Sequence, residues 1–326
     1  MAQVNLSTSD FKKFIFKFLL PFIFVLGIFG YTFNFWFENN IIFASKLSGA
    51  SKVNRILKQT YSDEIPIFGS SRAECNYIPD SLGNNFYNYG IGGTKGDVMF
   101  FFANQECLKN KKTPLIITFD INGLSNRIWD IPIYIPNIKN KQVAELVGKE
   151  NKFIYKIPLL KYFGYYEFYL KYAFMPKLEV TKFINKGSQI FKYSVSPKMF
   201  NEFVIEQGIK NQVFENDSTL EKGFLNLFKA HPERTFIIVV PPYHNSCFKN
   251  FKNYSDAVNF LKLLKTFPNL KVFDLSKLPL DDSKFADTIH LTFEGAKIFN
   301  AALKDSLNAS IEIRKFLKKL FKLLIF

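Results

Sequence analysis

The feature that most constrains this chain is an apolar run from Phe14 to Phe37, which reads FIFKFLLPFIFVLGIFGYTFNFWF. Lys17 is the only charged residue in the run. As a helix, the run is long enough to cross a hydrocarbon core of about 30 Å. We therefore expect a transmembrane helix over 14–37. The alternative is a buried helix of a cytoplasmic domain.

The charges that flank this run predict its orientation. Lys12, Lys13 and Lys17 lie toward its N-terminal side, whereas Glu38 follows it directly. Because cytoplasmic flanks carry the excess of lysine and arginine, we expect a cytoplasmic tail over 1–13 and the bulk of the chain outside. The small residues at 48–50 come too late for signal-peptide cleavage, which favours an uncleaved anchor. The predicted location is the cytoplasmic membrane, crossed once, with the main domain in the periplasm or on the outer face.

The chain is also strongly basic. It has 326 residues, with 43 Lys and Arg against 28 Asp and Glu, and a formal net charge of +15. Such a charge attracts a protein to anionic surfaces, among them acidic lipids, anionic surface glycans and nucleic acid. No helix-turn-helix, zinc-site or RNA-binding signature accompanies the charge, so nucleic acid is not expected as a partner.

The last 18 residues carry a pattern of their own. They contain IRKFLKKLFKLLIF, in which lysines and apolar residues recur with helical spacing. The pattern predicts a basic amphipathic helix over 309–326. Such a helix can lie on an anionic membrane surface, or it can dock on the domain as an ordinary terminal helix.

Five short apolar runs alternate with segments of helical character and predict the fold. The runs are Ile65–Phe68, Phe86–Gly90, Pro114–Asp120, Thr235–Pro242 and Leu270–Leu275. TKGDVMFFFANQECLKN and AVNFLKLLKTF, which lie between strands, have helical apolar spacing. Strand, helix and strand in succession predict parallel pairing with right-handed crossovers. The expected fold class is α/β, a doubly wound, five-stranded parallel sheet of the flavodoxin-like kind, with ligands beyond the carboxyl ends of the strands.

Composition suggests where this α/β domain begins and is interrupted. The polar segment 38–63 is expected to be a linker, and the domain to cover 64–308. An insertion is expected at about 125–222, since the alternation stops there and FIYKIPLLKYFGYYEFYLKYAFMPK mixes aromatic and basic residues. Aromatic side chains of this kind form either a core or a binding platform, and the insertion could cover the site or face the membrane.

Candidate catalytic residues fall at two places. Ser70 and Ser71 follow the first predicted strand in the sequence GSSR, and Asp287 and His290 lie three residues apart before a helical segment. A serine becomes a nucleophile when an imidazole accepts its proton, and a carboxylate orients that imidazole. Ser71, His290 and Asp287 could supply these three roles. The simpler interpretation is a turn serine, a surface histidine and a helix-capping carboxylate.

These motifs resemble the SGNH hydrolase superfamily, also called GDSL esterases and lipases, over about Ile65–Asp120 and Thr235–Leu303. The family's first block, Gly-Asp-Ser-Leu, is matched by GSSR, and the resemblance implies that Ser71 is the nucleophile. Its fifth block, Asp-x-x-His, is matched by Asp287 and His290. Gly-Ser-Ser-Arg variants are similar to membrane-anchored bacterial members such as D-alanyl transfer and alginate O-acetylation proteins.

The remaining blocks imply an oxyanion site. NYGIGGT matches the glycine block and places a backbone donor at Gly93, while DING matches Gly-x-Asn-Asp and assigns the amide donor to Asn122. The third donor implied is the backbone N–H of Ser71. Two further residues, Arg72 and His244, are candidates for lining the substrate site. No cofactor and no metal site is expected.

The blocks also depart from the family pattern. Ser70 and Arg72 stand where the first block has Asp and Leu, and Asp120 and Gly123 stand at the first and last positions of the third. Cys75, Cys107 and Cys247 match no metal-binding spacing, and at most one pair could form a disulfide.

Together these features predict a membrane-anchored, extracytoplasmic serine acyl esterase or O-acyltransferase that modifies a cell-surface polysaccharide. The expected partners are the membrane, an anionic or acylated surface glycan and, by the resemblance, a multispanning membrane O-acyltransferase. The altered blocks and the aromatic insertion leave an alternative, a non-catalytic glycan-binding or assembly protein with a decayed site.

Overall fold

The computed structural model describes residues 8–45, 49–94, 96–121, 131–149, 153–174, 181–193, 218–251 and 253–324. The chain divides into two compact units. The first unit comprises Met1–Ser51 and Ile131–Met175, and the second comprises Lys52–Asp130 and Pro176–Phe326.

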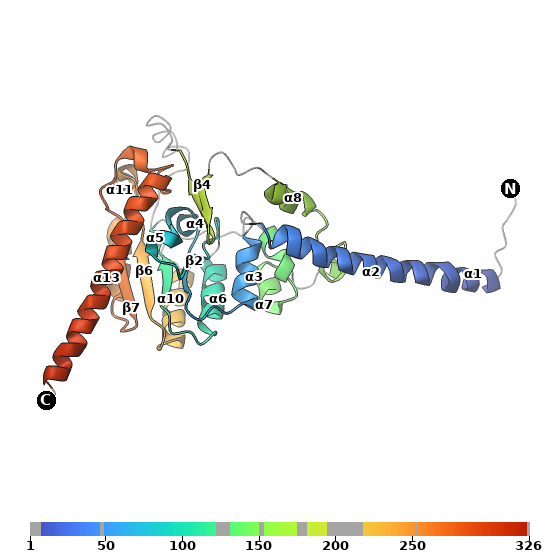
Figure 1. The fold of residues 1–326 in the computed structure, drawn as a ribbon, viewed down its shortest axis with the longest axis horizontal. Coiled ribbons are helices and arrows are strands. Elements are labelled where there is room, and N and C mark those ends of the chain that lie inside the picture. The colour runs from blue at the N-terminus through green and yellow to red at the C-terminus, as the bar shows by residue number, and fades with distance from the viewer. Residues whose placement is uncertain are drawn as a thin grey trace. The chain divides into compact units, whose positions relative to one another are not determined.

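The first unit is built on one long helix, drawn in blue in Figure 1. Its consecutive parts are α1 (Thr8–Phe14), the π-helical η1 (Ile15–Leu19), α2 (Leu20–Phe37) and the π-helical η2 (Glu38–Ile42). Over Phe11–Ile42, the most apolar 18-residue stretch has a mean hydropathy of 2.1, and 6% of it is buried. By length and composition this helix could cross a membrane.

Shorter elements complete the first unit. They are the 3-10 helices η3 (Ile131–Ile133), η4 (Ile135–Asn137) and η5 (Phe153–Lys156), and the α-helices α7 (Lys141–Leu146) and α8 (Tyr166–Phe174). The core of this unit is aromatic. In it, Phe37 of α2 packs against the rings of Tyr162, Tyr166 and Tyr169.

The second unit contains a five-stranded sheet. Its strands are β1 (Ile65–Phe68), β2 (Phe86–Asn88), β3 (Leu115–Thr118), β6 (Phe236–Val240) and β7 (Leu270–Asp274). Their order is β2-β1-β3-β6-β7, and every pairing is parallel. The predicted fold class is confirmed, and each strand lies within the apolar run that predicted it. The central strands β3 and β6 are buried along their whole length, which explains their uninterrupted apolar sequence.

Helices cover both faces of the sheet. One face packs α4 (Ser71–Asn76), α5 (Pro79–Leu82) and α13 (Phe293–Leu324) against Ile67, Ile116 and Ile237. In Figure 1, α13 (red) runs alongside β6 and β7. Contacts between aromatic rings attach α6 (Gly96–Cys107), α10 (Ser218–Ala230) and α12 (Tyr254–Leu264) to the other side. The short helices α11 (Asn245–Asn250) and η7 (Asp282–Lys284) complete the unit.

The segment 38–63, expected to be a linker, is partly helical. The segment contains η2 and a further helix, α3 (Ala50–Lys58), in which Val53 and Ile56 are buried. Lys52 is buried as well, and its Nζ lies 2.8 Å from Oε1 of Glu74. The apolar positions three residues apart favour a helix despite the polar composition.

The expected insertion over 125–222 does not form one body. Ile131–Met175 belongs to the first unit, whereas the second unit contains a hairpin of β4 (Thr181–Asn185) and β5 (Ser188–Phe191). The backbone N–H of Asn88 donates to the carbonyl of Lys186 at 2.9 Å, so the hairpin lies against the edge strand β2. A Cβ atom on Gly187 (φ +85°) would lie 1.9 Å from the Asn88 carbonyl, and this position therefore requires glycine.

The expected boundary between residues 308 and 309, where the α/β domain would end and a separate C-terminal helix begin, falls inside a single helix. Helix α13 is continuous from Phe293 to Leu324, so the predicted C-terminal helix is the second half of an element that begins in the α/β domain.

Candidate active site

Ser71 lies where the first strand meets its helix. Strand β1 ends at Phe68, Ser70 is extended (φ −85°, ψ −152°), and Ser71 is the first residue of α4. This places the side chain at the carboxyl edge of the parallel sheet, where such folds bind ligands. The first N–H groups of a helix have no intrahelical acceptor, and the Ser71 N–H is one of these.

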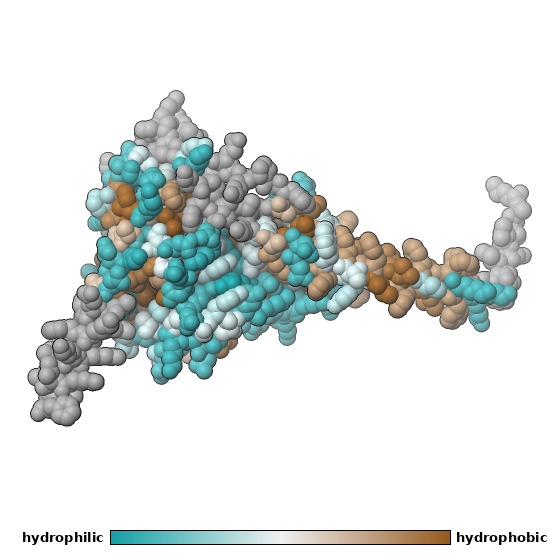
Figure 2. Space-filling view, viewed as in Figure 1, coloured by the Kyte–Doolittle hydropathy of each residue, from teal (hydrophilic) through white to brown (hydrophobic). Residues whose placement is uncertain are grey.

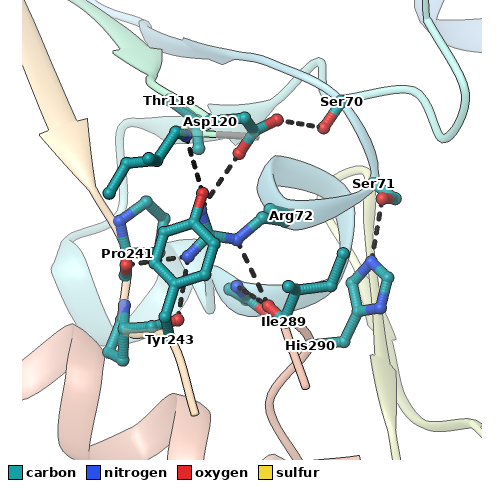
Figure 3. A network of polar contacts seen from close by, with 12 residues as sticks. Ser70, Ser71, Arg72, Thr118, Asp120, Pro241, Tyr243, Ile289 and His290 are labelled. Atoms are coloured by element: carbon teal, nitrogen blue, oxygen red, sulfur yellow. Dashed lines mark hydrogen bonds and ion pairs between the residues drawn. The ribbon is translucent and has the colours of Figure 1, made fainter. Parts of the chain in front are cut away.

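Ser71, His290 and Asp287 form a continuous chain of hydrogen bonds. Nε2 of His290 lies 2.8 Å from Oγ of Ser71, and Nδ1 of His290 lies 2.7 Å from Oδ2 of Asp287. Figure 3 shows the imidazole directed at the serine hydroxyl. All three side chains are partly accessible to solvent. The structure thus brings together the three residues selected from the sequence, in an order that allows proton transfer from serine to histidine.

Asp287 is held by its own loop. Its Oδ1 atom accepts hydrogen bonds from the backbone N–H groups of Ile289 and His290, both at 2.8 Å. Burial raises the pKa of Asp287, but the adjacent His290 and these hydrogen bonds outweigh burial and lower the pKa below its ordinary value. The carboxylate therefore remains ionised and keeps the imidazole oriented.

The glycine loop after β2 lies beside Ser71. A Cβ atom on Gly92 would be 3.7 Å from Cβ of Ser71, and the Gly92 N–H donates to Oε2 of Glu74 at 2.9 Å. Gly93 has a φ of +66°, and its N–H has no hydrogen-bond acceptor in the part of the chain that the structure describes. Asn122, the expected amide donor, lies outside the described residues.

Arg72 occupies a different place from the one expected. Its side chain is 1% exposed, so it does not line an open substrate surface. The guanidinium lies 3.5 Å from the ring centroid of Tyr243 and donates to four oxygens (Figure 3). These are Asp120 Oδ1 at 3.2 Å and the carbonyls of Pro241 at 2.7 Å, Pro242 at 2.8 Å and Ile289 at 3.3 Å. Arg72 thereby connects the helix that carries Ser71 to the loop that carries His290.

Ser70 and Asp120 complete this buried network, which sequence reasoning missed. The hydroxyl of Ser70 donates to Oδ2 of Asp120. Burial raises the pKa of Asp120, while Arg72 and Ser70 partly oppose the shift. The available signal was that both residues follow the ends of neighbouring strands, β1 and β3, and so meet at one edge of the sheet.

His244 is held by its immediate surroundings. Its Nδ1 accepts the backbone N–H of Ser246 at 3.3 Å, which caps α11, and lies 2.8 Å from the Ser246 hydroxyl. Its Nε2 lies 2.9 Å from Oδ1 of Asp282. With both ring nitrogens engaged, the contacts of His244 are those of a structural residue.

The β4–β5 hairpin, also missed, provides one wall of the site. The ring of Phe191 lies 5.6 Å from that of His290, and Nε2 of Gln189 donates to Glu74 at 3.3 Å. The signal in the sequence was the turn-forming Lys186–Gly187 between short apolar runs.

Among the described residues, no group of three or more His, Cys, Asp or Glu side chains could hold a metal ion. Cys75, Cys107 and Cys247 are all buried and unpaired.

No protein-family model and no curated protein matches this chain. A solved structure from Streptococcus pneumonia, provisionally described as a platelet activating factor, is similar with a TM-score of 0.40 and 11% identity, over 83% of this chain and 96% of the other. A likeness of this level assigns neither family nor activity.

Proposed function

We propose that this protein is a membrane-anchored, extracytoplasmic serine esterase or O-acyltransferase that acts on acyl groups of a cell-surface polysaccharide. The observation that carries the proposal is the hydrogen-bonded chain from Ser71 through His290 to Asp287. This arrangement suits attack of a serine hydroxyl on an acyl carbonyl.

The reaction would proceed through an acyl-enzyme. As Oγ of Ser71 bonds to the acyl carbon, Nε2 of His290 takes the hydroxyl proton, and Asp287 stabilises the resulting imidazolium. When the ester bond breaks, His290 returns this proton to the leaving alkoxide. A water molecule or a sugar hydroxyl then attacks the acyl-enzyme, again with His290 as base. Water completes hydrolysis, and a sugar hydroxyl completes transfer.

Backbone donors beside Ser71 would stabilise the oxyanion. The N–H of Ser71 at the start of α4 and the N–H of Gly93 in the adjacent loop are the two candidates among the described residues. The resemblance adds the side chain of Asn122. Fixed donors of this kind act mainly on the transition state, and losing one costs about a hundredfold to a thousandfold in turnover.

The contact between Ser70 and Asp120 bears on the altered sequence blocks. Ser70 replaces the aspartate of the SGNH first block, and Asp120 replaces the glycine of the third. These two positions are hydrogen-bonded to each other, and Arg72 pairs with Asp120. The departures therefore compensate one another, which supports a functional variant of the SGNH site over a decayed one.

The proposed location rests on the apolar N-terminal helix and its flanking lysines. The net charge of +15 suits an anionic glycan or an acidic membrane surface. A multispanning membrane O-acyltransferase is proposed as acyl donor or partner on the resemblance alone.

Labelling with a serine-reactive fluorophosphonate tests the proposal. The full chain in detergent should form one adduct, located at Ser71 by peptide mass spectrometry and lost in His290→Ala. The chain offers a matched control, because Ser246 also lies 2.8 Å from a histidine that contacts an aspartate. His244→Ala should leave the Ser71 adduct unchanged. An adduct only at Ser246, or none in protein shown by circular dichroism to be folded, would contradict the proposal.

A further inference from the structure

A second apolar surface lies in the first unit, apart from the long helix. Five large apolar side chains within 18 residues are exposed to solvent: Phe153 (69%), Ile154, Leu160, Phe163 (69%) and Leu170. Elsewhere in the described chain, outside the long helix, exposed side chains of this kind are far apart in sequence, as Leu108 and Leu263 are. Scattered apolar residues are normal on a protein surface, but a concentration of them indicates a binding surface.

This segment packs directly on the helix that could cross the membrane. A Cβ atom on Gly30 would lie 3.0 Å from Cγ of Leu159 and 3.1 Å from Cβ of Pro158. The backbone N–H of Leu159 donates to Oδ1 of Asn34 at 3.4 Å. One turn further along, Nζ of Lys161 lies 2.7 Å from Oε1 of Glu38. Residues 158–161 thus follow the face of the helix that runs from Gly30 to Glu38.

The position of these contacts along the helix sets their depth. Residues 18–37 contain no charge, and at about 1.5 Å per residue they span roughly the 30 Å of a hydrocarbon core. Gly30 lies seven residues, about 10 Å, inside the Phe37 end of that span. If the core is instead centred nearer Lys17, Gly30 remains close to its boundary. If the helix crosses a bilayer in either position, Pro158 and Leu159, which contact Gly30, lie at the level of lipid.

The exposure of side chains along the long helix is consistent with lipid around its N-terminal part and protein against its C-terminal part. Toward its N-terminal end, side chains such as Phe22 and Val25 are exposed, and Figure 2 shows an apolar helix with a hydrophilic end. Near the other end, Gly30, Asn34 and Phe37 are buried. A polar side chain in a membrane span is expected to face protein, and the amide oxygen of Asn34 does so by accepting from Leu159.

Basic and aromatic residues accompany the apolar surface. Lys139 and Lys156, both exposed, line a cavity of about 150 Å³ beside Tyr31 and Asn34 of α2. Tyrosine and lysine are typical of the layer where lipid head groups begin, and lysine is attracted to anionic head groups there.

We infer that the segment Phe153–Leu170 is immersed in the same bilayer that the N-terminal helix crosses, in the leaflet next to Phe37. Phe153 and Phe163 insert among the lipid chains, and Lys139 and Lys156 face the head groups. The inference rests on the membrane anchoring in the proposed function, but it is independent of the chemistry at Ser71.

Single-cysteine labelling of the full chain in vesicles of phosphatidylethanolamine and phosphatidylglycerol tests the inference. Phe163→Cys and, separately, Phe153→Cys are coupled to an environment-sensitive fluorophore. The native cysteines are buried, and mass spectrometry confirms that the label is confined to the new site. Each labelled protein is then exposed to doxyl-labelled lipid and to iodide. We expect a blue-shifted emission, quenching by the doxyl lipid and little quenching by iodide at both positions.

Two further positions calibrate the result. Val25→Cys lies in the middle of the long helix and should be quenched by doxyl lipid. Lys141→Cys lies in the same unit on α7, where the lysine side chain is 88% exposed, and should be quenched by iodide. If Val25 is quenched by lipid while both Phe153 and Phe163 are quenched by iodide, the anchor stands and the inference is overturned in favour of a protein partner for this surface. If the fluorophore on Val25→Cys is itself quenched by iodide, both the membrane anchoring and the inference are overturned. Fluorophosphonate labelling of Ser71 reports separately on the enzyme.

Discussion

Nε2 of His290 lies 2.8 Å from Oγ of Ser71, although the two residues are 219 positions apart in the chain. Ser71 follows the strand β1, and His290 lies in the loop before α13. The side chains of Arg72 and Asp287 keep His290 close to Ser71. Arg72 donates a hydrogen bond to the carbonyl of Ile289. Asp287 is hydrogen-bonded to the imidazole of His290 and accepts from the backbone N–H of Ile289.

Replacement of Ser71 by alanine should abolish acyl turnover and leave the fold intact. The hydroxyl is partly accessible, so its loss creates no buried cavity. With a p-nitrophenyl acyl ester as substrate, we expect a loss of at least about ten-thousandfold. The control is Ser246→Ala, which should retain activity. Hydrolysis by Ser71→Ala at the wild-type rate would exclude Ser71 as the nucleophile.

Asp287→Asn should reduce kcat by up to about ten-thousandfold, because the amide no longer fixes the imidazole tautomer. Asp282→Asn is the matched control, since Asp282 also contacts a histidine ring, that of His244. Steady-state kinetics of both variants separate the two. Equal losses in both, or none in Asp287→Asn, would contradict the role assigned to Asp287.

The lowered pKa of Asp287 also predicts how the stability of the fold depends on pH. Because its pKa is lowered in the folded state, ionised Asp287 stabilises the fold above the unfolded-state pKa of about 3.9. This stabilisation is lost as the pH falls through the lower, folded-state pKa. Between about pH 5 and pH 3, the wild type should therefore lose more stability toward urea than Asp287→Asn. Parallel pH profiles for the two proteins would show that Asp287 makes no such contribution.

Arg72→Met should lower the free energy of unfolding by about 3–5 kcal/mol, because it leaves the buried carboxylate of Asp120 without its cation. The double variant Arg72→Met, Asp120→Asn removes both charges and should recover part of the loss. Urea denaturation of the wild type, the two single variants and the double variant measures the coupling. Additive effects would mean that the pair is not coupled.

Gly93→Ala should lower turnover by about a hundredfold, because a φ of +66° suits glycine and a shift of the loop displaces its N–H donor. Gly148→Ala is a matched control. Gly148 has a φ of +62°, and a Cβ atom there would have no neighbour within 4 Å. Both variants should lose about 1–2 kcal/mol of stability. A similar loss of turnover in both would indicate a general effect of stability rather than a role for Gly93.

Local patterns in the sequence were sufficient for the sheet. A strand buried on both faces, such as Phe236–Val240, reads as an uninterrupted apolar run, and such runs in alternation with helical segments imply parallel strands. The same pattern placed Ser71 at the carboxyl edge, whereas its link with Asp287 and His290 came from the chemistry of a serine-histidine-aspartate triad and from the resemblance of the two motifs to the SGNH blocks. The strands themselves need only neighbours along the chain.

Other features were decided by tertiary structure. The sequence suggested that Arg72 lines the substrate site, but its guanidinium is buried against acceptors 48 residues away at Asp120 and 169 residues away at Pro241. The segment 38–63 is polar in composition, yet one face of α3 within it is buried, because Val53 and Ile56 share that face. The hairpin that walls the site shares a backbone hydrogen bond with β2 across 98 residues, from Asn88 to Lys186. Such pairings depend on which strand edges and buried charges meet in space. The sequence by itself thus determined the strands, the apolar helix and the candidate nucleophile, whereas the partners of Arg72, Asp120 and Asn88 followed only from the packing of distant segments.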